Sequence, residues 1–170
     1  PELQETDEWL RLSASDGVRY RRAVAAGNFM AMRQAGLSSA DPARCAKTER
    51  LLELVVEAAA NGRKVVIYSY FREAIELVGR ALPIPSFGPI TGELNPAKRQ
   101  QVVDDFTAHA GPAVLVAQIQ AGGVGLNIQA ASVVILVEPQ LTPTSEDQAV
   151  ARAHRMGQVR SVQVHRLLNE

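Results

Sequence analysis

The residues whose types and spacing are most suited to chemistry are two arginines near the carboxyl end of the 170-residue chain. Arg152 and Arg155 lie within the string QAVARAHRMGQ, and Gln148 precedes Arg152 by four residues. If the segment 144–156 is helical, the three side chains share one face. Two adjacent guanidinium groups favour an anion between them, and phosphate fits the planar fork of arginine at two points. The alternative is a solvated basic surface.

The local charge favours phosphate binding. The whole chain has 18 basic and 18 acidic residues, so its formal net charge is +0. Such a balance argues against a general nucleic-acid coat protein, which carries a cationic excess. Residues 148–169, however, contain four arginines and no aspartate or glutamate. The overall neutrality therefore conceals a cationic segment that is suited to a phosphate group.

A glycine-rich segment, QIQAGGVGLN, is the second candidate site. Gly122, Gly123 and Gly125 fall within four residues, directly after an apolar run at 113–117. Glycines permit positive φ and allow backbone amides to approach a phosphate closely. The segment is no dinucleotide fingerprint, because Ile128 stands where a third glycine is needed, and no Gly-Lys pair exists for a P-loop. A tight turn without a ligand is the alternative.

Other kinds of catalytic or metal site are unsupported. His109, His154 and His165 are too far apart in sequence for a spaced metal motif, so no metal site is predicted. No G-x-S-x-G elbow is present. The single cysteine, Cys45, cannot form an internal disulfide or a multi-thiolate metal site, and we expect a buried, inert thiol.

The elements that must position these residues alternate between strand and helix after Asn61. Nearly continuous apolar runs are typical of parallel strands covered on both faces. The alternation predicts an α/β fold with an open, mostly parallel sheet, in which ligands gather at the carboxyl ends of the strands. The predicted strands are 64–69, 113–117, 132–137 and 161–167, with a weaker one at 86–91, and the predicted helices are 72–82, 96–108 and 144–156.

The first 61 residues are predicted to be helical throughout. Residues 17–35 form one expected helix, and Asp41-Pro42 opens a second that stops at Asn61-Gly62. We therefore divide the chain into a helical lead-in at 1–61 and an α/β lobe at 62–170. At 46% apolar residues it can close a core. A polar start and the lack of a long apolar run predict a cytoplasmic chain, or a nuclear one in a eukaryote, without a membrane partner.

Taken in order, these segments resemble the second motor lobe of the Swi/Snf family of helicase-like, DNA-stimulated ATPases in helicase superfamily two. The family's fold for this region is a RecA-like three-layer α/β lobe. The resemblance covers about 64–168 and, more faintly, 20–54, which resembles the linker from the first lobe. The matching segments are KVVIYSYF at 64–71, Thr91-Gly92 with Arg99, VLVAQIQAGGVGLN at 114–127 and QAVARAHRMGQ at 148–158.

The resemblance implies a role for the arginines. Arg152 and Arg155 would reach the phosphates of an ATP that is held, with Mg²⁺, mainly by the first lobe of the same parent chain. As arginine fingers they would stabilise charge on the γ-phosphoryl group, and Gln148 would orient them or the nucleotide. The family's Gly-Lys-Thr loop and Asp-Glu box are not in this chain. We therefore expect the chain to be inactive alone and its parent to be a DNA-dependent ATPase.

The resemblance also implies contacts with double-stranded DNA. Gly123, Gly125 and Asn127 would couple the nucleotide cleft to the DNA. Opening and closing of two lobes would move the protein along the duplex by translocation, without necessarily separating the strands. The candidate contacts to DNA phosphates are Thr91, Gln118, Gly122 and Gly123.

Several positions differ from the family pattern. Ala117-Gln118 stands where Ser-Thr is usual, Tyr70 where Gln is common, and Glu138 where Asp is usual. Leu141-Thr142-Pro143 replaces Trp-Asn-Pro. Two alternative functions are a non-catalytic phosphate- or RNA-binding α/β module and the second lobe of an RNA helicase. RNA helicase lobes more often read His-Arg-x-Gly-Arg-x-x-Arg, so the string at 148–158 favours the Swi/Snf-type motor.

Overall fold

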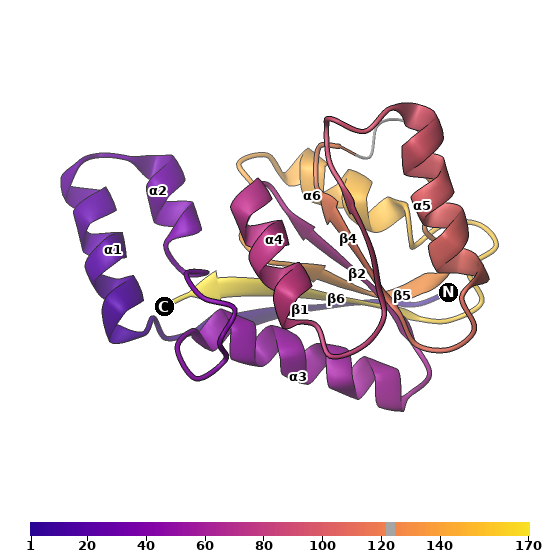
Figure 1. Cartoon of the computed structure of the whole chain (residues 1–170), viewed down its shortest axis with the longest axis horizontal. Coiled ribbons are helices and arrows are strands. Elements are labelled where there is room, and N and C mark those ends of the chain that lie inside the picture. The colour runs from indigo at the N-terminus through magenta and orange to yellow at the C-terminus, as the bar shows by residue number, and fades with distance from the viewer. Residues whose placement is uncertain (122–124) are drawn as a thin grey trace.

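The computed structural model describes residues 1–121 and 125–170. In that part of the chain six strands form one sheet in the order β1-β6-β5-β2-β4-β3, and every neighbouring pair is parallel (Figure 1). The strands are β1 (Leu3–Leu10), β2 (Lys64–Ser69), β3 (Ser86–Ile90), β4 (Val114–Gln118), β5 (Ala131–Leu136) and β6 (Val162–Asn169). The helices are α1 (Ala14–Ala25), α2 (Phe29–Gln34), α3 (Ala46–Ala60), α4 (Arg72–Ala81), α5 (Pro96–Ala108) and α6 (Pro143–Ala151).

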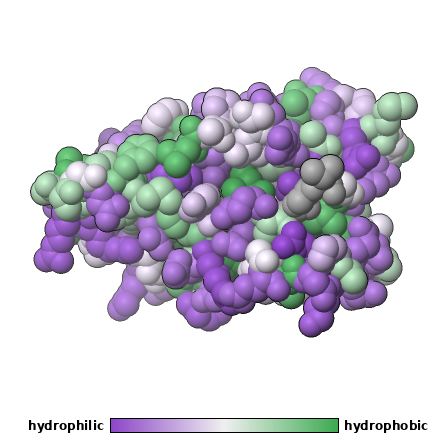
Figure 2. Space-filling view, turned by 90° about the horizontal axis from the view of Figure 1, so that it is seen from above, coloured by the Kyte–Doolittle hydropathy of each residue, from purple (hydrophilic) through white to green (hydrophobic). Residues whose placement is uncertain are grey.

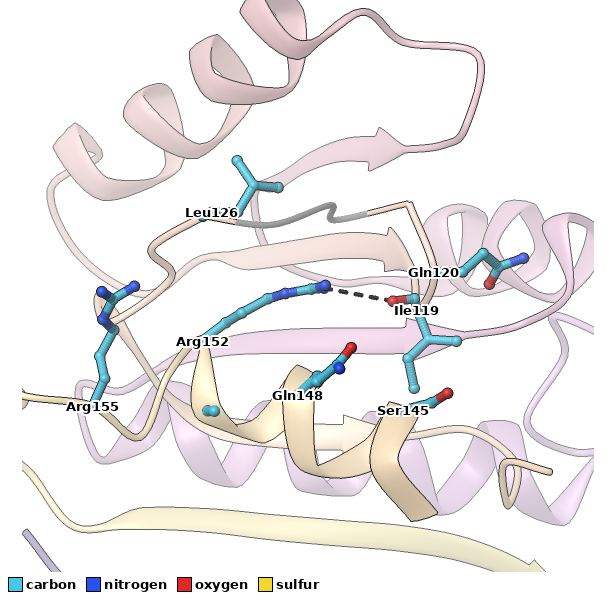
Figure 3. A pocket seen from close by; sticks show the side chains of 9 residues that line it. Ile119, Gln120, Leu126, Ser145, Gln148, Arg152 and Arg155 are labelled. Atoms are coloured by element: carbon cyan, nitrogen blue, oxygen red, sulfur yellow. Dashed lines mark hydrogen bonds between the residues drawn. The ribbon is translucent and has the colours of Figure 1, made fainter. Parts of the chain in front are cut away.

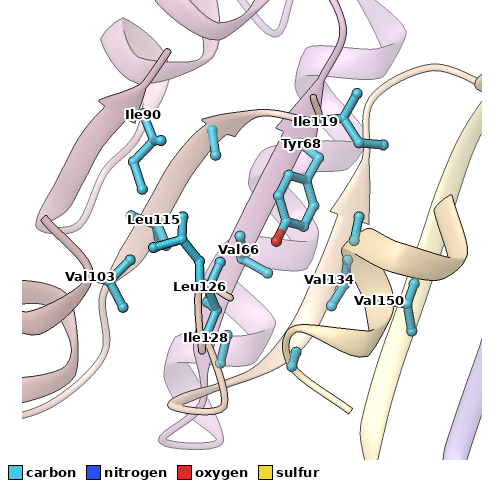
Figure 4. Packing of buried hydrophobic residues seen from close by; sticks show 14 of the residues in the cluster. Val66, Tyr68, Ile90, Val103, Leu115, Ile119, Leu126, Ile128, Val134 and Val150 are labelled. Atoms are coloured by element: carbon cyan, nitrogen blue, oxygen red, sulfur yellow. The ribbon is translucent and has the colours of Figure 1, made fainter. Parts of the chain in front are cut away.

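Helices cover both faces of the sheet, which confirms the predicted three-layer α/β fold. Successive residues of β2 point to opposite faces because a strand has a period of two. Val65 and Ile67 pack with buried residues of α3 and α4, whereas Val66 and Tyr68 pack with those of α5 and α6. Figure 4 shows the cluster of buried residues that contains Val66 and Tyr68. In it the Tyr68 ring lies on the face of the sheet that α6 covers.

The first strand corrects the prediction that residues 1–61 are helical throughout. Residues 3–10 form β1, which pairs with β6 along its whole length. Arg166 of β6 also holds this edge strand, through ion pairs with Glu5 and Asp7. A mainly polar strand at a sheet edge has no buried face, so its sequence carries no period of two that could reveal it.

The start of α3 is a second correction. The segment Asp41-Pro42 does not open a helix, because the Asp41 carboxylate accepts a hydrogen bond from the amide of Ala43 at 3.0 Å and closes a local turn instead. The helix begins at Ala46. Its buried residues belong to the same cluster as Val65 and Ile67, so α3 is part of the core of the lobe. The domain boundary at 61/62 stays a prediction.

Helices α1 and α2 form a hairpin that projects beyond the carboxyl ends of β1 and β6 (Figure 1). Ser13 caps α1 and Asn28 caps α2, each by accepting a backbone N–H three residues ahead. Gly27, at φ +64°, separates the two helices. The expected helix at 17–35 is therefore two helices with a tight turn between them.

Two oppositely charged groups are buried at the carboxyl end of β5. The Lys47 ammonium donates to the carbonyl of Val137 at 2.6 Å. The Glu138 carboxylate accepts from the Ser69 hydroxyl at 2.8 Å and from the Tyr70 amide at 2.6 Å. Burial lowers the pKa of Lys47 to about 8, and the negative charge of Glu138 opposes that shift. These bonds join α3, β5 and the end of β2. Cys45, close by in sequence, is buried as expected.

We expect Lys47→Met to show a destabilisation that grows with pH. The pKa of Lys47 is lower in the folded than in the unfolded state, so between pH 8 and 10.5 the unfolded state binds more protons and Lys47 contributes stability that rises with pH. Relative to the unmodified chain, the variant should lose about 2 kcal/mol more at about pH 9.5 than at about pH 7. Urea unfolding at both pH values measures this, and a pH-independent difference contradicts it.

Candidate functional site

A pocket of about 540 Å³ lies between the segment after β4 and helix α6 (Figure 3). It brings the predicted residues Gln148, Arg152 and Arg155 together with Gly125 of the glycine-rich segment. Their roles there stay predictions. The lining residues are Ile119, Gln120, Gly125, Leu126, Ser145, Gln148, Ala151, Arg152 and Arg155.

The local structure that brings Arg155 to the pocket differs from the predicted one. Helix α6 ends at Ala151, with Arg152 as its C-cap, and not at Met156. Gln148 and Arg152 still lie one helical turn apart, but Arg155 comes from the turn that follows. Figure 3 shows the result: Arg152 reaches across the pocket, and Arg155 rises separately at one end of it. The three side chains therefore share a pocket, but Arg155 does not lie on the helix face that carries Gln148 and Arg152.

Gln158 holds the turn that follows the helix. This side chain is 8% exposed, and its Nε2 lies within 3.0 Å of the carbonyl oxygens of Gln129, Ala131 and Ala153. Satisfying these buried groups draws the chain back toward the sheet. Gly157, at φ +95°, supplies a backbone conformation that other residues rarely adopt. The signal for this turn in the sequence is the pair Gly157-Gln158, which the sequence analysis used only as part of the arginine motif.

Arg152 is held from several sides. Its Nη1 lies 3.5 Å from the carbonyl of Ile119, and its own carbonyl accepts from the amide of Ile128 at 2.9 Å. The side chain of Tyr68, which is fully buried on β2, is a neighbour of the Arg152 guanidinium. Burial raises the pKa of the Tyr68 hydroxyl to about 12, while the positive charge of Arg152 acts in the opposite direction. Arg152 is thus half-buried and fixed, whereas Arg155 is exposed.

The glycine-rich segment is described only in part. Gly122 and Gly123, predicted to bind DNA and to couple the two sites, lie outside the described residues. Gly125 has φ +106° and lines the pocket. Asn127 does not line it; its side-chain oxygen accepts from the Gln129 amide at 3.2 Å in a local turn. Asn127, for which a coupling role was predicted, therefore makes no direct contact with the pocket.

The candidate DNA contacts lie in a separate cluster at the carboxyl ends of β2, β3 and β4. The Gln118 side chain accepts from the Gly92 amide at 3.2 Å and donates to the carbonyl of Tyr70 at 3.4 Å. Arg99 donates to the carbonyls of Gly92 and Leu94, so it stabilises the turn at Thr91-Gly92. Thr91 itself is buried, which disfavours a direct contact from its side chain. Gln118 is half-buried.

The face seen from above, toward which β2 and β4 point, is covered mostly by hydrophilic residues with small separate apolar patches (Figure 2). Sequence reasoning missed Arg33, whose guanidinium lies over the rings of Tyr70 and Phe71 at this edge. Its signal was weak, because Arg33 is one of many arginines in the helical lead-in. No described helix is long and apolar enough to cross a membrane.

The donors in the pocket fit phosphate better than a metal ion. Two guanidinium groups, the Gln148 amide and the Ser145 hydroxyl line it, and no carboxylate does so among the described residues. Magnesium prefers carboxylate and phosphate oxygens, so the pocket fits the phosphates of a nucleotide and not its Mg²⁺. Across 1–121 and 125–170, no cluster of three or more His, Cys, Asp or Glu side chains is placed to hold a metal.

Comparison with known proteins gives a consistent result. Residues 46–157 match the helicase conserved C-terminal domain. The chain is 35% identical over 125 residues to an ATP-dependent helicase of Mycoplasma pneumoniae, a match that covers 72% of this chain and 12% of that protein. It is also 31% identical over 124 residues to the SNF2 domain-containing protein ENL1 of Oryza sativa subsp. japonica, a match that covers 72% of this chain and 13% of that protein. The chain spans about an eighth of the length of these relatives.

Solved structures share the fold. The C-terminal part of the Fun30 ATPase domain superposes with a TM-score of 0.90 at 16% identity, covering 100% of this chain and 85% of that one. The Sulfolobus solfataricus SWI2/SNF2 ATPase core in complex with dsDNA gives 0.78 at 22% identity, covering 99% and 41%. At these identities the likeness concerns the fold.

We expect Gln158→Ala to destabilise the chain by about 2 kcal/mol, because it leaves buried carbonyl groups without a donor. Urea unfolding measures the loss. The matched control is Gln163→Ala on β6, whose half-buried side chain makes no hydrogen bond with a described residue. Equal stability of the two variants would show that Gln158 does not hold the turn.

Proposed function

Because this chain belongs to the helicase conserved C-terminal domain family and is the second, RecA-like lobe of a Swi/Snf-type ATPase, we propose that its parent is an ATP-dependent translocase on double-stranded DNA. One observation carries the proposal. The pocket beside α6 gathers Gln148, Arg152 and Arg155, two cations and an amide, without a carboxylate among the described residues. This donor set is suited to the phosphates of ATP.

In this proposal the two arginines have different roles, because Arg155 is exposed and Arg152 is half-buried. Arg155 is exposed, so it can extend toward a nucleotide held by the first lobe and stabilise charge that develops on the γ-phosphoryl group. Arg152 is fixed by the Ile119 and Ile128 backbone and meets the phosphates as a second, pre-organised fork. Mg²⁺ neutralises phosphate charge when it is bound. The first lobe supplies its ligands, since the described part of this pocket offers none.

The proposed DNA contacts lie at the edge formed by β2, β3 and β4. In this proposal the Gln118 side chain, which is fixed between Gly92 and Tyr70, contacts the backbone of the duplex. Contacts of this kind position a protein without reading sequence, as a translocase requires. The Sulfolobus protein of the same fold was solved with dsDNA, which supports a duplex as the substrate.

Two alternatives differ from this proposal in their chemistry. A phosphate- or RNA-binding module would use the pocket without turnover, and an RNA helicase lobe would act on RNA. The string QAVARAHRMGQ and the SWI2/SNF2 fold neighbour favour the DNA translocase over both. We further propose a cytoplasmic location, or a nuclear one if the parent is eukaryotic.

We expect Arg155→Ala in the parent protein to lower DNA-stimulated ATP turnover on the order of 10³-fold while ATP binding stays nearly unchanged, because the lost contact acts on the transition state. Steady-state turnover and equilibrium nucleotide binding separate the two effects. Arg19→Ala, an exposed arginine on α1, is the control and should keep full turnover. Unchanged turnover in Arg155→Ala would remove that residue from the proposed role.

The isolated chain should hydrolyse no ATP above background, with or without duplex DNA, since the pocket offers arginines but no group to hold the nucleotide's Mg²⁺ among its described residues. A phosphate-release assay on the purified chain tests this. Robust DNA-stimulated turnover by the chain alone would overturn the proposal that the first lobe is required.

A further inference from the structure

The outer face of helix α3 carries one apolar and one acidic ridge, and neither belongs to the sites described above. In each ridge the residues recur every four positions, so both ridges run along the same side of the helix. The apolar ridge is Leu52, Val56 and Ala60, and the acidic ridge is Glu49, Glu53 and Glu57. All six residues line a hollow of about 580 Å³ on the outside of the lobe.

The acidic ridge has few partners of its own. Arg50 donates to Glu53 at 3.0 Å, but the same guanidinium also donates to both carboxylate oxygens of Glu8. Glu49 and Glu57 form no ion pair with a described residue. Like charges four residues apart on a helix repel one another. This face therefore favours a partner that brings positive charge.

The apolar ridge is open to solvent beside these charges. Val56 is 54% exposed, whereas Val55 and Ala58 on the opposite side of the helix are buried in the core. A partner for this face must therefore combine apolar side chains with cations, as an amphipathic basic helix does.

Helix α1 of the projecting hairpin carries such a surface. Val18 is 42% exposed, and Arg21 and Arg22, three and four residues further on, lie on the same side of the helix. Neither arginine forms an ion pair within the described part of the chain. The one acidic residue of α1, Asp16, is buried and accepts from the Ser38 hydroxyl, so it does not neutralise them.

We propose that α1 of one copy of this chain packs on the outer face of α3 of a second copy. Ridges spaced four residues apart pack into one another in the commonest class of helix pairs. Val18 packs beside Val56, and Arg21 and Arg22 lie along the acidic ridge. The hairpin projects from the lobe, so α1 can reach a second molecule (Figure 1). The inference does not rest on the proposed function, because it uses neither the arginine pocket nor the DNA edge.

The expected association is weak and depends on salt. One pair of helices buries less area than a stable dimer needs, so we expect a Kd of about 10 to 100 μM. Ion pairs at the surface are screened by salt. Raising the salt concentration from about 50 to about 300 mM should therefore weaken the association about fivefold.

The test is sedimentation velocity of the chain between about 5 and 500 μM. The chain closes a core on each face of its sheet, so it can be studied by itself. Glu53→Lys with Glu57→Lys, or Arg21→Glu with Arg22→Glu, should weaken the association at least about tenfold. An equal mixture of the two double variants should restore it, because an acidic α1 then meets a basic α3. Recovery in the mixture also shows that both variants are folded.

The matched control reverses two exposed acidic residues of α5, Asp104→Lys with Asp105→Lys, and should associate like the unmodified chain. A chain that stays monomeric at every concentration overturns the inference. Association that survives both reversals, or that the mixture does not restore, overturns it as well. If the variant of Arg21 and Arg22 loses affinity for duplex DNA and keeps its self-association, α1 binds nucleic acid instead, and the inference is wrong.

Discussion

The carboxyl ends of the central strands depend on one buried carboxylate. Glu138 is 2% exposed, so its charge must be satisfied from within the protein, and the Ser69 hydroxyl and the Tyr70 amide do this. Those bonds fix the end of β2 against the end of β5. Lys47 brings α3 to the same place and supplies the opposite charge. Removing any partner would leave a buried polar group unpaired, so this edge of the lobe behaves as one unit.

The two candidate sites meet at two adjacent residues, Gln118 and Ile119. Gln118 belongs to the edge cluster with Gly92 and Tyr70, and the next residue, Ile119, lines the arginine pocket and lies against Arg152. A shift of this short segment would change both sites at once. A continuous segment of this kind can carry energetic coupling between two sites.

The strands and helices of the central sheet could be predicted from the sequence, because apolar residues buried on both faces leave continuous β-branched runs, as in 64–69 and 132–137. The failures have physical causes. The polar edge strand β1 is held by backbone pairing and by Arg166, which no local pattern reveals. The turn after helix α6 is held by Gln158, which donates to carbonyls far away in the sequence. The arginines could thus be picked out, but the turn that delivers Arg155 could not.

The pairing of β1 with β6 joins the two ends of the described chain, since Leu3 lies opposite Val162 and Leu10 opposite Asn169. Within this lobe β1 therefore has no partner until β6 has been made. The other five strands and α3 to α6 can form a core beforehand, with β6 exposing one edge that awaits β1. The sheet is thus expected to grow from its centre outward, with its earliest segment added last, because pairing over such a sequence separation carries the largest loop-closure entropy.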